Sequence, residues 1–405
     1  MTGRARNALV VTLTFLSAAS AAAQEPVGAS APPTTSAPGW TLTPAFGYGA
    51  TFDDNVSLFG VRTAEELNDD FISTYRPSLN VDYHGKHVRA GAGYTGTLLS
   101  YRTFTTLNRW EQRGRASVSR QETARLKWSA RGAAATLPST DLIDLGGIPY
   151  RHTGARTADA RGGVDFALGA RDGLTSSMSY LDIEFDHVPD NDAILRGGHV
   201  LESMNAWRHR FGPRLSAGTD YSFRRAAVVG DIHQFSIHAT EAGVDYEISP
   251  TWTFSGGAGV AYVESTATTA ARTGPAWRIA VDRRGASSSV NVGYVRSFVP
   301  SFGFGGTIQN QEVGVSYRTA LFRSRHWFMH HSAVFRDDTP LTSAFQQLPL
   351  RSLRTNSMLG WEPQPWVRLE VFYARVQQTS LRYAGQLYRN RVGFQIVTSK
   401  PVRVS

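Results

Sequence analysis

The stretch YRPSLNVDYH, residues 75–84, alternates strictly between two kinds of side chain. One face carries Tyr75, Pro77, Leu79, Val81 and Tyr83, and the other carries Arg76, Ser78, Asn80, Asp82 and His84. A period of two is the signature of a β-strand whose faces meet different surroundings. The length also suits a tilted strand that crosses a bilayer, which takes roughly 9–11 residues. The stretch therefore predicts one strand of a membrane β-barrel.

The same alternation recurs toward both ends of the chain. Runs with one apolar and one polar face occur at 88–98, 109–118, 125–131, 215–223, 252–262, 313–317 and 367–373. Hydrophobic residues make up only 41% of the chain, as expected of a barrel in which every second strand residue faces lipid. The sequence predicts an all-β fold, a transmembrane antiparallel outer-membrane β-barrel of about 18 strands.

Short and long connections between these runs alternate, which fixes the predicted topology. Short turns are expected at 84–86, 121–123, 170–173, 212–214, 249–251, 283–286, 321–324 and 364–365. Longer loops are expected at 53–70, 102–107, 136–155, 184–198, 226–231, 264–274, 298–307, 336–351 and 377–386. Outer-membrane barrels have short periplasmic turns and long external loops, so both termini are expected in the periplasm.

The N-terminal region indicates export. Arg4 and Arg6 precede an apolar run at 8–18, and small residues at 21–23 follow it. This order is typical of a cleaved signal peptide, predicted here as residues 1–23. Residues 24–39, rich in Pro, Ala, Ser and Thr, are expected to form a flexible periplasmic lead-in, and 40–405 the barrel. The chain has no cysteine, which suits an exported fold held by a closed hydrogen-bonded ladder.

A soluble sandwich or propeller is the alternative all-β interpretation. Its strands would be about 5 or 6 residues long, and it would bury its aromatic side chains. Here most tryptophans fall at or near predicted strand ends, where an interfacial girdle is expected. The residues concerned are Trp40, Trp110, Trp128, Trp252, Trp277, Trp327, Trp361 and Trp366.

The end of the first predicted strand reads Phe52-Asp53-Asp54-Asn55, after Pro44 to Tyr48. An aromatic residue followed by Asp-Asp-Asn at this place resembles the β-barrel porin 2 family. That resemblance implies an association with exopolysaccharide biosynthesis and export in Gram-negative bacteria. One departure is the C-terminus, which lacks a terminal aromatic residue; Phe394 is the nearest candidate.

Two interpretations of Asp53, Asp54 and Asn55 are open. They can form a turn, because Asp and Asn tolerate the left-handed region and cap their own backbone. They can also bind a divalent cation or bridge to lipopolysaccharide. The turn is favoured, because paired carboxylates alone do not define a coordination site.

Basic residues on the polar face of predicted strands 2 to 5 form a candidate site. A charge at mid-membrane on the lipid face would cost about 2–4 kcal/mol, so this face is expected to line the lumen. Either these charges solvate a water-filled pore, or they attract anions through it. This basic wall comprises Arg76, Arg89, Arg109, Arg113, Arg115, Arg125, Lys127 and Arg131.

The third long loop is a candidate constriction. It carries Asp141 and Asp144 close to Gly146 and Gly147, and Pro149 follows. These residues permit a sharp turn that could bring the loop into the lumen. A loop that stays outside is equally compatible with the sequence.

No constellation of catalytic or metal-binding residues is predicted, and no cofactor is expected. The chain has no Gly-x-Ser-x-Gly elbow, and His330 and His331 are expected on opposite faces of one strand. The function expected is a non-enzymatic outer-membrane conduit, part of exopolysaccharide export through the resemblance. The alternatives are a general or anion-preferring porin, a plugged structural barrel and an outer-membrane enzyme. Expected partners are outer-membrane lipid, lipopolysaccharide, anionic polysaccharide and periplasmic export proteins, but not nucleic acid, because the basic residues line a pore.

Overall fold

The computed structural model describes residues 38–58, 68–186, 195–228, 234–264, 270–303, 306–322, 324, 326–341, 349–380 and 385–404. The predicted signal peptide and almost all of the predicted lead-in lie outside the described residues. No helix in the described part of the chain is long and apolar enough to cross a membrane.

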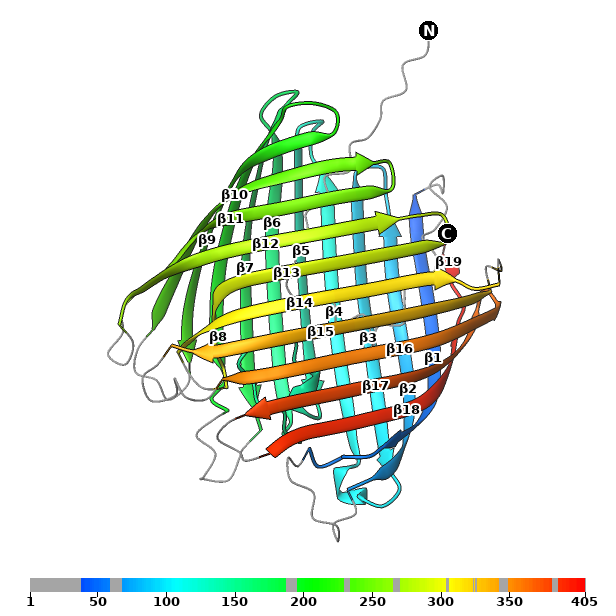
Figure 1. The fold of residues 1–405 in the computed structure, drawn as a ribbon. Coiled ribbons are helices and arrows are strands. Elements are labelled where there is room, and N and C mark those ends of the chain that lie inside the picture. The colour runs from blue at the N-terminus through cyan, green and yellow to red at the C-terminus, as the bar shows by residue number, and fades with distance from the viewer. Residues whose placement is uncertain are drawn as a thin grey trace.

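Antiparallel strands make up nearly all of the described chain (Figure 1). They are β1 (Gly39–Asp53), β2 (Asp70–His84), β3 (Val88–Tyr101), β4 (Arg109–Gln121), β5 (Leu126–Leu137), β6 (Ala155–Ala167), β7 (Asp172–Phe185), β8 (Gly198–Arg210), β9 (Leu215–Val228), β10 (Phe235–Ser249), β11 (Trp252–Val263), β12 (Arg272–Arg284), β13 (Ser288–Pro300), β14 (Thr307–Ala320), β15 (Trp327–Pro340), β16 (Leu350–Gln364), β17 (Val367–Ser380), β18 (Gly385–Ser399) and β19 (Val402–Val404). Two short 3-10 helices, η1 (Thr105–Leu107) and η2 (Thr140–Leu142), lie in loops.

The sheet closes on itself. Each strand pairs with the next along the chain, and β1 pairs with β18 over nine residues, from Ala45 opposite Ser399 to Asp53 opposite Arg391. The short β19 pairs with the start of β1, so β18 and β19 form one strand interrupted at 400–401. Pro401 lacks a backbone N–H and suits such an interruption. The predicted barrel of 18 antiparallel strands is therefore confirmed.

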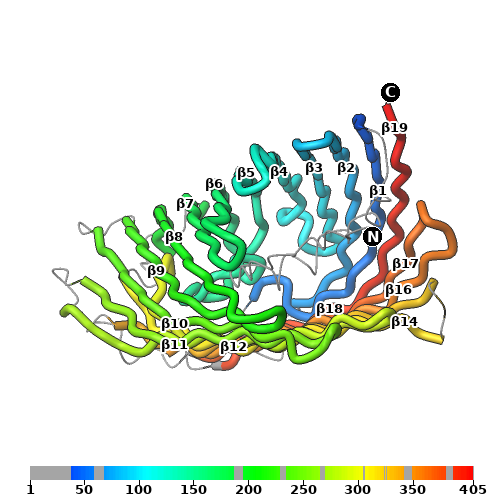
Figure 2. The backbone as a smooth tube through the Cα atoms, turned by 90° about the horizontal axis from the view of Figure 1, so that it is seen from above, coloured from blue at the N-terminus to red at the C-terminus, as the bar shows by residue number. Residues whose placement is uncertain are grey.

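The alternation seen in the sequence separates an outer face from an enclosed interior. Figure 2 shows β1 to β9 along one side of that interior and β10 to β18 along the other. On β2, Leu79 is 42% exposed on the outside, whereas Arg76 and Asn80 line an interior cavity. Large apolar side chains are exposed on the outer face of nearly every strand. An apolar surface of this extent is unstable in water and suits the hydrocarbon of a bilayer.

The tryptophans are unevenly distributed between the two ends of the barrel. We call the end with the short connections, which also holds Gly39, the turn end, and the opposite end the loop end. Trp110 lies at the loop end and Trp277 lies within β12, away from the strand ends where the sequence placed it. The other seven lie at the turn end: Trp40, Trp128, Trp207, Trp252, Trp327, Trp361 and Trp366. Tryptophan therefore contributes to the interfacial aromatic girdle mainly at the turn end.

The strands are longer than the sequence pattern indicated at several loops. β17 extends to Ser380 and β18 begins at Gly385, so the loop expected at 377–386 is reduced to 381–384. Polar residues such as Gln377, opposite Tyr388, continue the ladder there. Polarity near a strand end therefore misled the prediction of where this loop begins.

Labelling of single-cysteine variants tests the inside–outside assignment, in a chain without other cysteines. A cysteine at Asn80 should react with a water-soluble thiol reagent, because this position lines an interior cavity. Cysteines at Leu79 and Val81 should be protected in lipid, because side chains alternate strictly along a strand. Mass spectrometry of the labelled barrel measures this. Labelling at 79 and 81 without labelling at 80 would show that the register is wrong by one residue.

Candidate functional site

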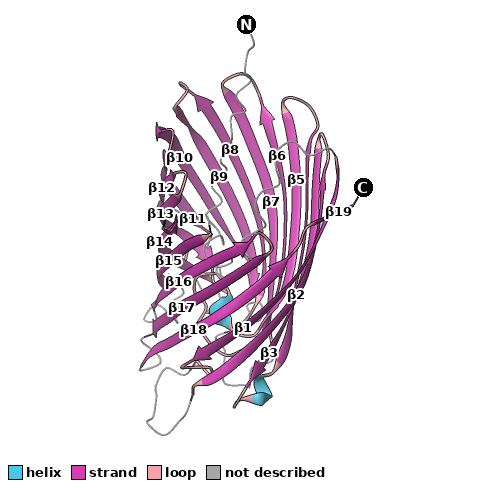
Figure 3. Cartoon of the chain, turned by 90° about the vertical axis from the view of Figure 1, so that its right-hand side faces the viewer, coloured by secondary structure: helices cyan, strands magenta, loops and turns pink. Residues whose placement is uncertain are grey.

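The connection between β5 and β6, residues 138–154, runs into the barrel rather than away from it. Its short helix η2 lies within the outline of the strands in Figure 3, and Thr140 and Asp141 are buried. Ile143 and Ile148 join an apolar cluster with inward residues of several strands. We call residues 138–154 the inner loop. Of the two placements open to the sequence, the structure therefore has the inward one.

Asp141 anchors the inner loop to β18. Its carboxylate accepts a hydrogen bond from Arg389 Nη1 at 2.9 Å and lies 3.7 Å from Arg391 Nη2. Arg354 on β16 also donates to the Asp141 backbone carbonyl. Asp141 and Arg389 are both buried, and a buried ion pair with additional hydrogen bonds is costly to break. This contact fixes the first half of the inner loop across the lumen.

A second anchor holds the middle of the inner loop on β14 and β15. Arg336 bridges Asp144 of the loop and Glu312 of β14. Gly147 N–H donates to Asp338 at 2.7 Å, and its carbonyl accepts from Ser301 at 3.0 Å.

Gly147 is the position at which the turn requires glycine. Its φ is +69°, a backbone conformation that L side chains rarely adopt. A Cβ at this place would lie 2.5 Å from Ser301 Oγ, which leaves no room for a side chain. A Cβ at Gly146 would also lie close, 2.9 Å from an oxygen of Asp338. Gly146 and Gly147, which predicted a sharp turn, therefore let the backbone of the inner loop approach β14 and β15 closely.

The last part of the inner loop binds β17. Gln378 accepts a hydrogen bond from Tyr150 N–H at 2.7 Å and donates to the Ile148 carbonyl at 3.1 Å. Three anchors on β14 to β18 therefore hold the inner loop across the loop end of the barrel.

The Asp-Asp-Asn segment lies at the seam between β1 and β18. Arg389 donates to both oxygens of Asp53, at 3.2 and 2.6 Å, while it also contacts Asp141. Asp54 accepts hydrogen bonds from the backbone and side chain of Asn390, both at 2.7 Å. The Arg389 guanidinium therefore contacts both Asp53 at the seam that closes the barrel and Asp141 of the inner loop.

Backbone geometry after Asp53 is that of a turn. Asn55 N–H donates to Asp53 Oδ1 at 3.0 Å, and the Asn55 side chain donates to the Tyr388 carbonyl at 2.7 Å. Phe52 packs outside against Phe71, with ring centroids 5.5 Å apart. Both oxygens of Asp53 are occupied by Arg389, so this carboxylate is already neutralised by the protein itself.

The ion pairs of Asp141 should make the inner loop insensitive to moderate acid. Burial alone raises the pKa of Asp141, but Arg389, Arg391, the Ser139 hydroxyl and Arg354 outweigh it and lower the pKa to about 2. A depressed pKa adds stability that is complete above the usual value of 3.8 and is lost as the pH falls toward about 2.

Single-channel recordings at different pH values check this expectation. The open fraction of the barrel should stay constant from about pH 8 to about pH 5, because Asp141 remains ionised throughout. Opening should begin only below about pH 4, where the carboxylate starts to be protonated. A barrel that stays closed as the pH falls below about 3 would contradict the assignment of Asp141 as the residue that holds the loop.

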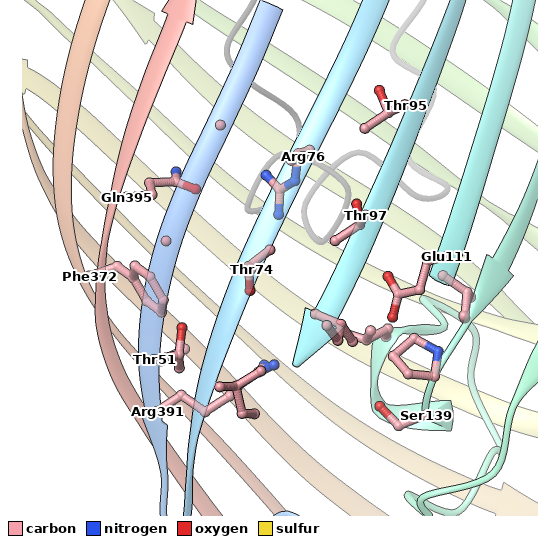
Figure 4. A pocket seen from close by; sticks show the side chains of 18 of the residues that line it. Thr51, Thr74, Arg76, Thr95, Thr97, Glu111, Ser139, Phe372, Arg391 and Gln395 are labelled. Atoms are coloured by element: carbon pink, nitrogen blue, oxygen red, sulfur yellow. The ribbon is translucent and has the colours of Figure 1, made fainter. Parts of the chain in front are cut away.

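A cavity of about 320 Å³, lined by both polar and apolar side chains, lies between the inner loop and the walls formed by β1 to β5 and β16 to β18. Arg76 on β2, Glu111 on β4 and Arg391 on β18 project toward it from different strands, with threonines between them (Figure 4). Six arginines and three carboxylic acids line it in all: Arg76, Arg113, Arg115, Arg354, Arg389, Arg391, Glu111, Asp141 and Asp144.

The electrostatic balance of this cavity depends on how its charges are paired. Arg354, Arg389 and Arg391 approach the carboxylates of the inner loop. Arg115 donates to Asn80 at 3.2 Å. In the described chain, Arg76 and Arg113 have no carboxylate oxygen within 4.0 Å, and Glu111 Oε1 is buried without a hydrogen-bond partner. The strand side of the cavity therefore presents positive charge and hydroxyls to whatever enters.

The predicted basic wall is divided by the structure into groups. Arg76, Arg113 and Arg115 line the cavity below the inner loop. Arg109 lies at the loop end, 3.5 Å from Asp186. Arg89, Lys127 and Arg131 line a second cavity at the turn end. Arg125 lies in the turn between β4 and β5 and is exposed, so it is not on a strand face.

Several residues that position the inner loop were not singled out from the sequence. They are Arg336, Asp338, Gln378, Arg389 and Arg391. All five lie at strand positions whose side chains point to the barrel interior. An inward arginine or glutamine near the loop end is the signal that could have found them, but the sequence does not say which loop they meet.

Comparisons with known proteins add no family assignment. No family model matches the sequence, and no curated protein matches it. Among solved structures, the chain is similar to OccAB4 of Acinetobacter baumannii at 11% identity, covering 92% of this chain and all of that one, with a TM-score of 0.47. It is also similar to OccK5 (OpdH) of Pseudomonas aeruginosa, at 9% identity over 91% of this chain and 99% of that one, with a TM-score of 0.45.

A bacterial polysaccharide outer membrane secretin is similar at 11% identity, over 88% of this chain and 97% of that chain, with a TM-score of 0.35. These identities and scores are too low to support an inference about function. The resemblance to the β-barrel porin 2 family stays a prediction, and the fold rests on the strand register described above.

Proposed function

We propose that this protein is an outer-membrane conduit that prefers small organic anions, with the inner loop forming its constriction. The observation that supports this most is the cavity below the inner loop, which is lined by Arg76 and Arg113, two arginines with no carboxylate oxygen within 4.0 Å in the described chain. Positive side chains in a narrow, low-dielectric passage concentrate the field and favour anions.

Two features limit what can pass while the inner loop is anchored. The apolar cluster of the inner loop and the inward ends of β5 to β12 fills part of the lumen at the loop end. The cavity below the inner loop has a volume of about 320 Å³, a size that suits small molecules. We therefore propose sugar acids and similar carboxylated solutes as the substrate class.

Swelling of liposomes that contain the purified barrel tests this proposal. A sugar acid should enter faster than a neutral sugar of the same size, because the arginines attract its carboxylate. Equal rates of entry for the two solutes would indicate a general porin without anion preference. Absence of swelling with either solute would favour a plugged structural barrel.

We propose that the loop end faces the cell exterior, since long loops are external in outer-membrane barrels. An epitope inserted after Thr106, an exposed residue within η1, should be detected on intact cells. An epitope inserted at Lys86, in the turn between β2 and β3, should require permeabilised cells. Flow cytometry measures both, and the opposite pattern would invert the proposed orientation.

Export of an anionic polysaccharide is a second candidate function. The Phe52-Asp53-Asp54-Asn55 segment favours it, through the resemblance to a family associated with exopolysaccharide export. A polymer would need the inner loop to leave the lumen, because Asp141, Asp144 and Gly147 are all tied to the opposite wall. Loss of surface polysaccharide on deletion of the gene, and its restoration by the intact chain, would support this function over the porin function.

A further inference from the structure

A second cavity, of about 390 Å³, lies on the same wall but at the turn end, among residues of β2 to β7. It shares no lining residue with the cavity below the inner loop. Its lining combines basic side chains with hydroxyls. These are Arg89, Lys127, Arg131 and Arg161, together with Ser117, Ser119, Ser129, Thr175 and Ser177.

Arg131 and Arg161 lie directly opposite each other in the ladder between β5 and β6, both on the inward face. Like charges directly opposite on neighbouring strands repel each other and destabilise a sheet. Arg161 donates to Ser177 Oγ at 3.1 Å. In the part of the chain that the structure describes, neither guanidinium has a carboxylate oxygen within 4.0 Å.

Some other inward arginines of this barrel are neutralised by acidic partners. Arg208 contacts Asp220 at 2.6 Å and Asp245 at 3.3 Å. Arg224 contacts Glu202 at 2.8 Å. The facing pair in the second cavity has no such close contact, and Asp159 and Glu202 influence Arg131 and Arg161 only from beyond 4.0 Å.

Charges around the pair leave the cavity positive. Asp82 and Asp165 also line it, against four basic side chains, and Asp165 accepts a hydrogen bond from Thr175 at 2.9 Å. Lys127 lies opposite Asp165 in the ladder. Hydroxyl groups and guanidinium forks together can donate to an anion from several directions.

We propose that this cavity binds a phosphoryl group between Arg131 and Arg161. A phosphate ester carries a charge of about −1.5 to −2 and three acceptor oxygens at neutral pH. That charge matches two guanidinium groups, and the remaining oxygens can accept from serine hydroxyls nearby. The inference rests on the proposed anion conduit and refines it, since it adds phosphorylated solutes to the substrate class.

Titration of the full-length, detergent-solubilised barrel with inorganic phosphate tests the proposal, with binding followed by calorimetry. The wild type should show saturable binding at one site. Either Arg131→Gln or Arg161→Gln should weaken the affinity at least about tenfold, since a bridged anion needs both forks. Arg131→Lys should recover only part of the affinity, because an ammonium group cannot make the bidentate contact.

Arg171→Gln is the matched control, because Arg171 lies in the exposed turn between β6 and β7 at the same end of the barrel. It should bind phosphate as the wild type does. Chloride at the same ionic strength should not displace phosphate. No saturable binding in the wild type, equal displacement by chloride, or unchanged affinity in both glutamine variants would each overturn the proposal.

Two further measurements identify the source of the phosphoryl group and distinguish failure of this inference from failure of the proposed function. Competition with a phosphate monoester and with a phosphodiester distinguishes a small phosphorylated solute from a phosphodiester polymer as the source of the group. The ion selectivity of the same preparations is recorded in a bilayer. Anion selectivity without phosphate binding would remove this inference alone, whereas phosphate binding without anion conduction would remove the proposed function.

Discussion

Replacing Arg389 with Ala should lower the free energy of unfolding of the barrel by about 3–5 kcal/mol, the usual cost of leaving a buried charge without its partner. Arg389 joins Asp53 at the seam to Asp141 of the inner loop. Both carboxylates are almost fully buried, with exposures of 0% and 1%. Without the guanidinium, Asp53 loses its ion pair with Arg389, and Asp141 is left with the longer contact to Arg391 at 3.7 Å. Urea titration of the folded barrel in detergent or lipid measures the loss.

The same variant should also open the barrel. Release of Asp141 frees the first anchor of the inner loop, so single-channel conductance should rise several-fold. Arg351→Ala is the control, because its pair with Asp337 is on the outside and its side chain is 65% exposed. Such surface pairs contribute about 0–1 kcal/mol. If both variants were equally stable, Arg389 would not hold the loop.

A triple variant separates the loss of the ion pairs from the cost of leaving buried charges unpaired. Combining Arg389→Met with Asp53→Asn and Asp141→Asn removes the arginine and both charges together. Since this replacement removes the three most deeply buried charges of this cluster together and leaves only Arg391 without its Asp141 contact, it should recover part of the lost stability. The inner loop should nevertheless open more readily than in the wild type.

Changing Arg76, Arg113 and Arg115 together to Gln should abolish anion preference while the barrel still folds. These residues line the cavity below the inner loop, and Gln remains soluble in a wet lumen. Glu111 stays in the same cavity, so a weak cation preference should replace the anion preference. The effect should be largest in dilute salt, where screening is weakest. Reversal potentials of the purified variant in a planar bilayer measure it.

The matched control changes three arginines on the outer face to Gln. Arg120, Arg156 and Arg225 have the outward parity on β4, β6 and β9. This variant loses the same charge from the chain but none from the lumen, so anion preference should be retained. An equal change in both variants would show that net charge, and not the wall, sets selectivity.

The sequence was sufficient for the fold because the alternation of residues 75–84 repeats in most strands and the short and long connections between them alternate. A shift of one residue would turn Leu79 into the lumen and Arg76 into lipid, so register is strongly specified. Loop boundaries were less predictable. Polar residues such as Gln377 continue the ladder beyond the apolar band, where neither face needs to be hydrophobic.

The site was only partly predictable. Parity alone placed Arg76, Arg113 and Arg115 on one wall, whereas Arg125 proved to lie in a turn. Gly146 and Gly147 indicated a sharp turn in the inner loop but not its destination. The destination depends on contacts such as Arg389 with Asp141, 248 residues apart in sequence. No local pattern specifies a pairing across that separation.

The most direct test of the central claim is the reversal potential of the wild-type barrel in a planar bilayer across a potassium chloride gradient. We expect a potential with the sign set by chloride, larger in dilute than in concentrated salt, since the arginines below the inner loop attract anions. A reversal potential with the sign set by potassium would show instead that carboxylates such as Glu111, and not the arginine wall, control the passage.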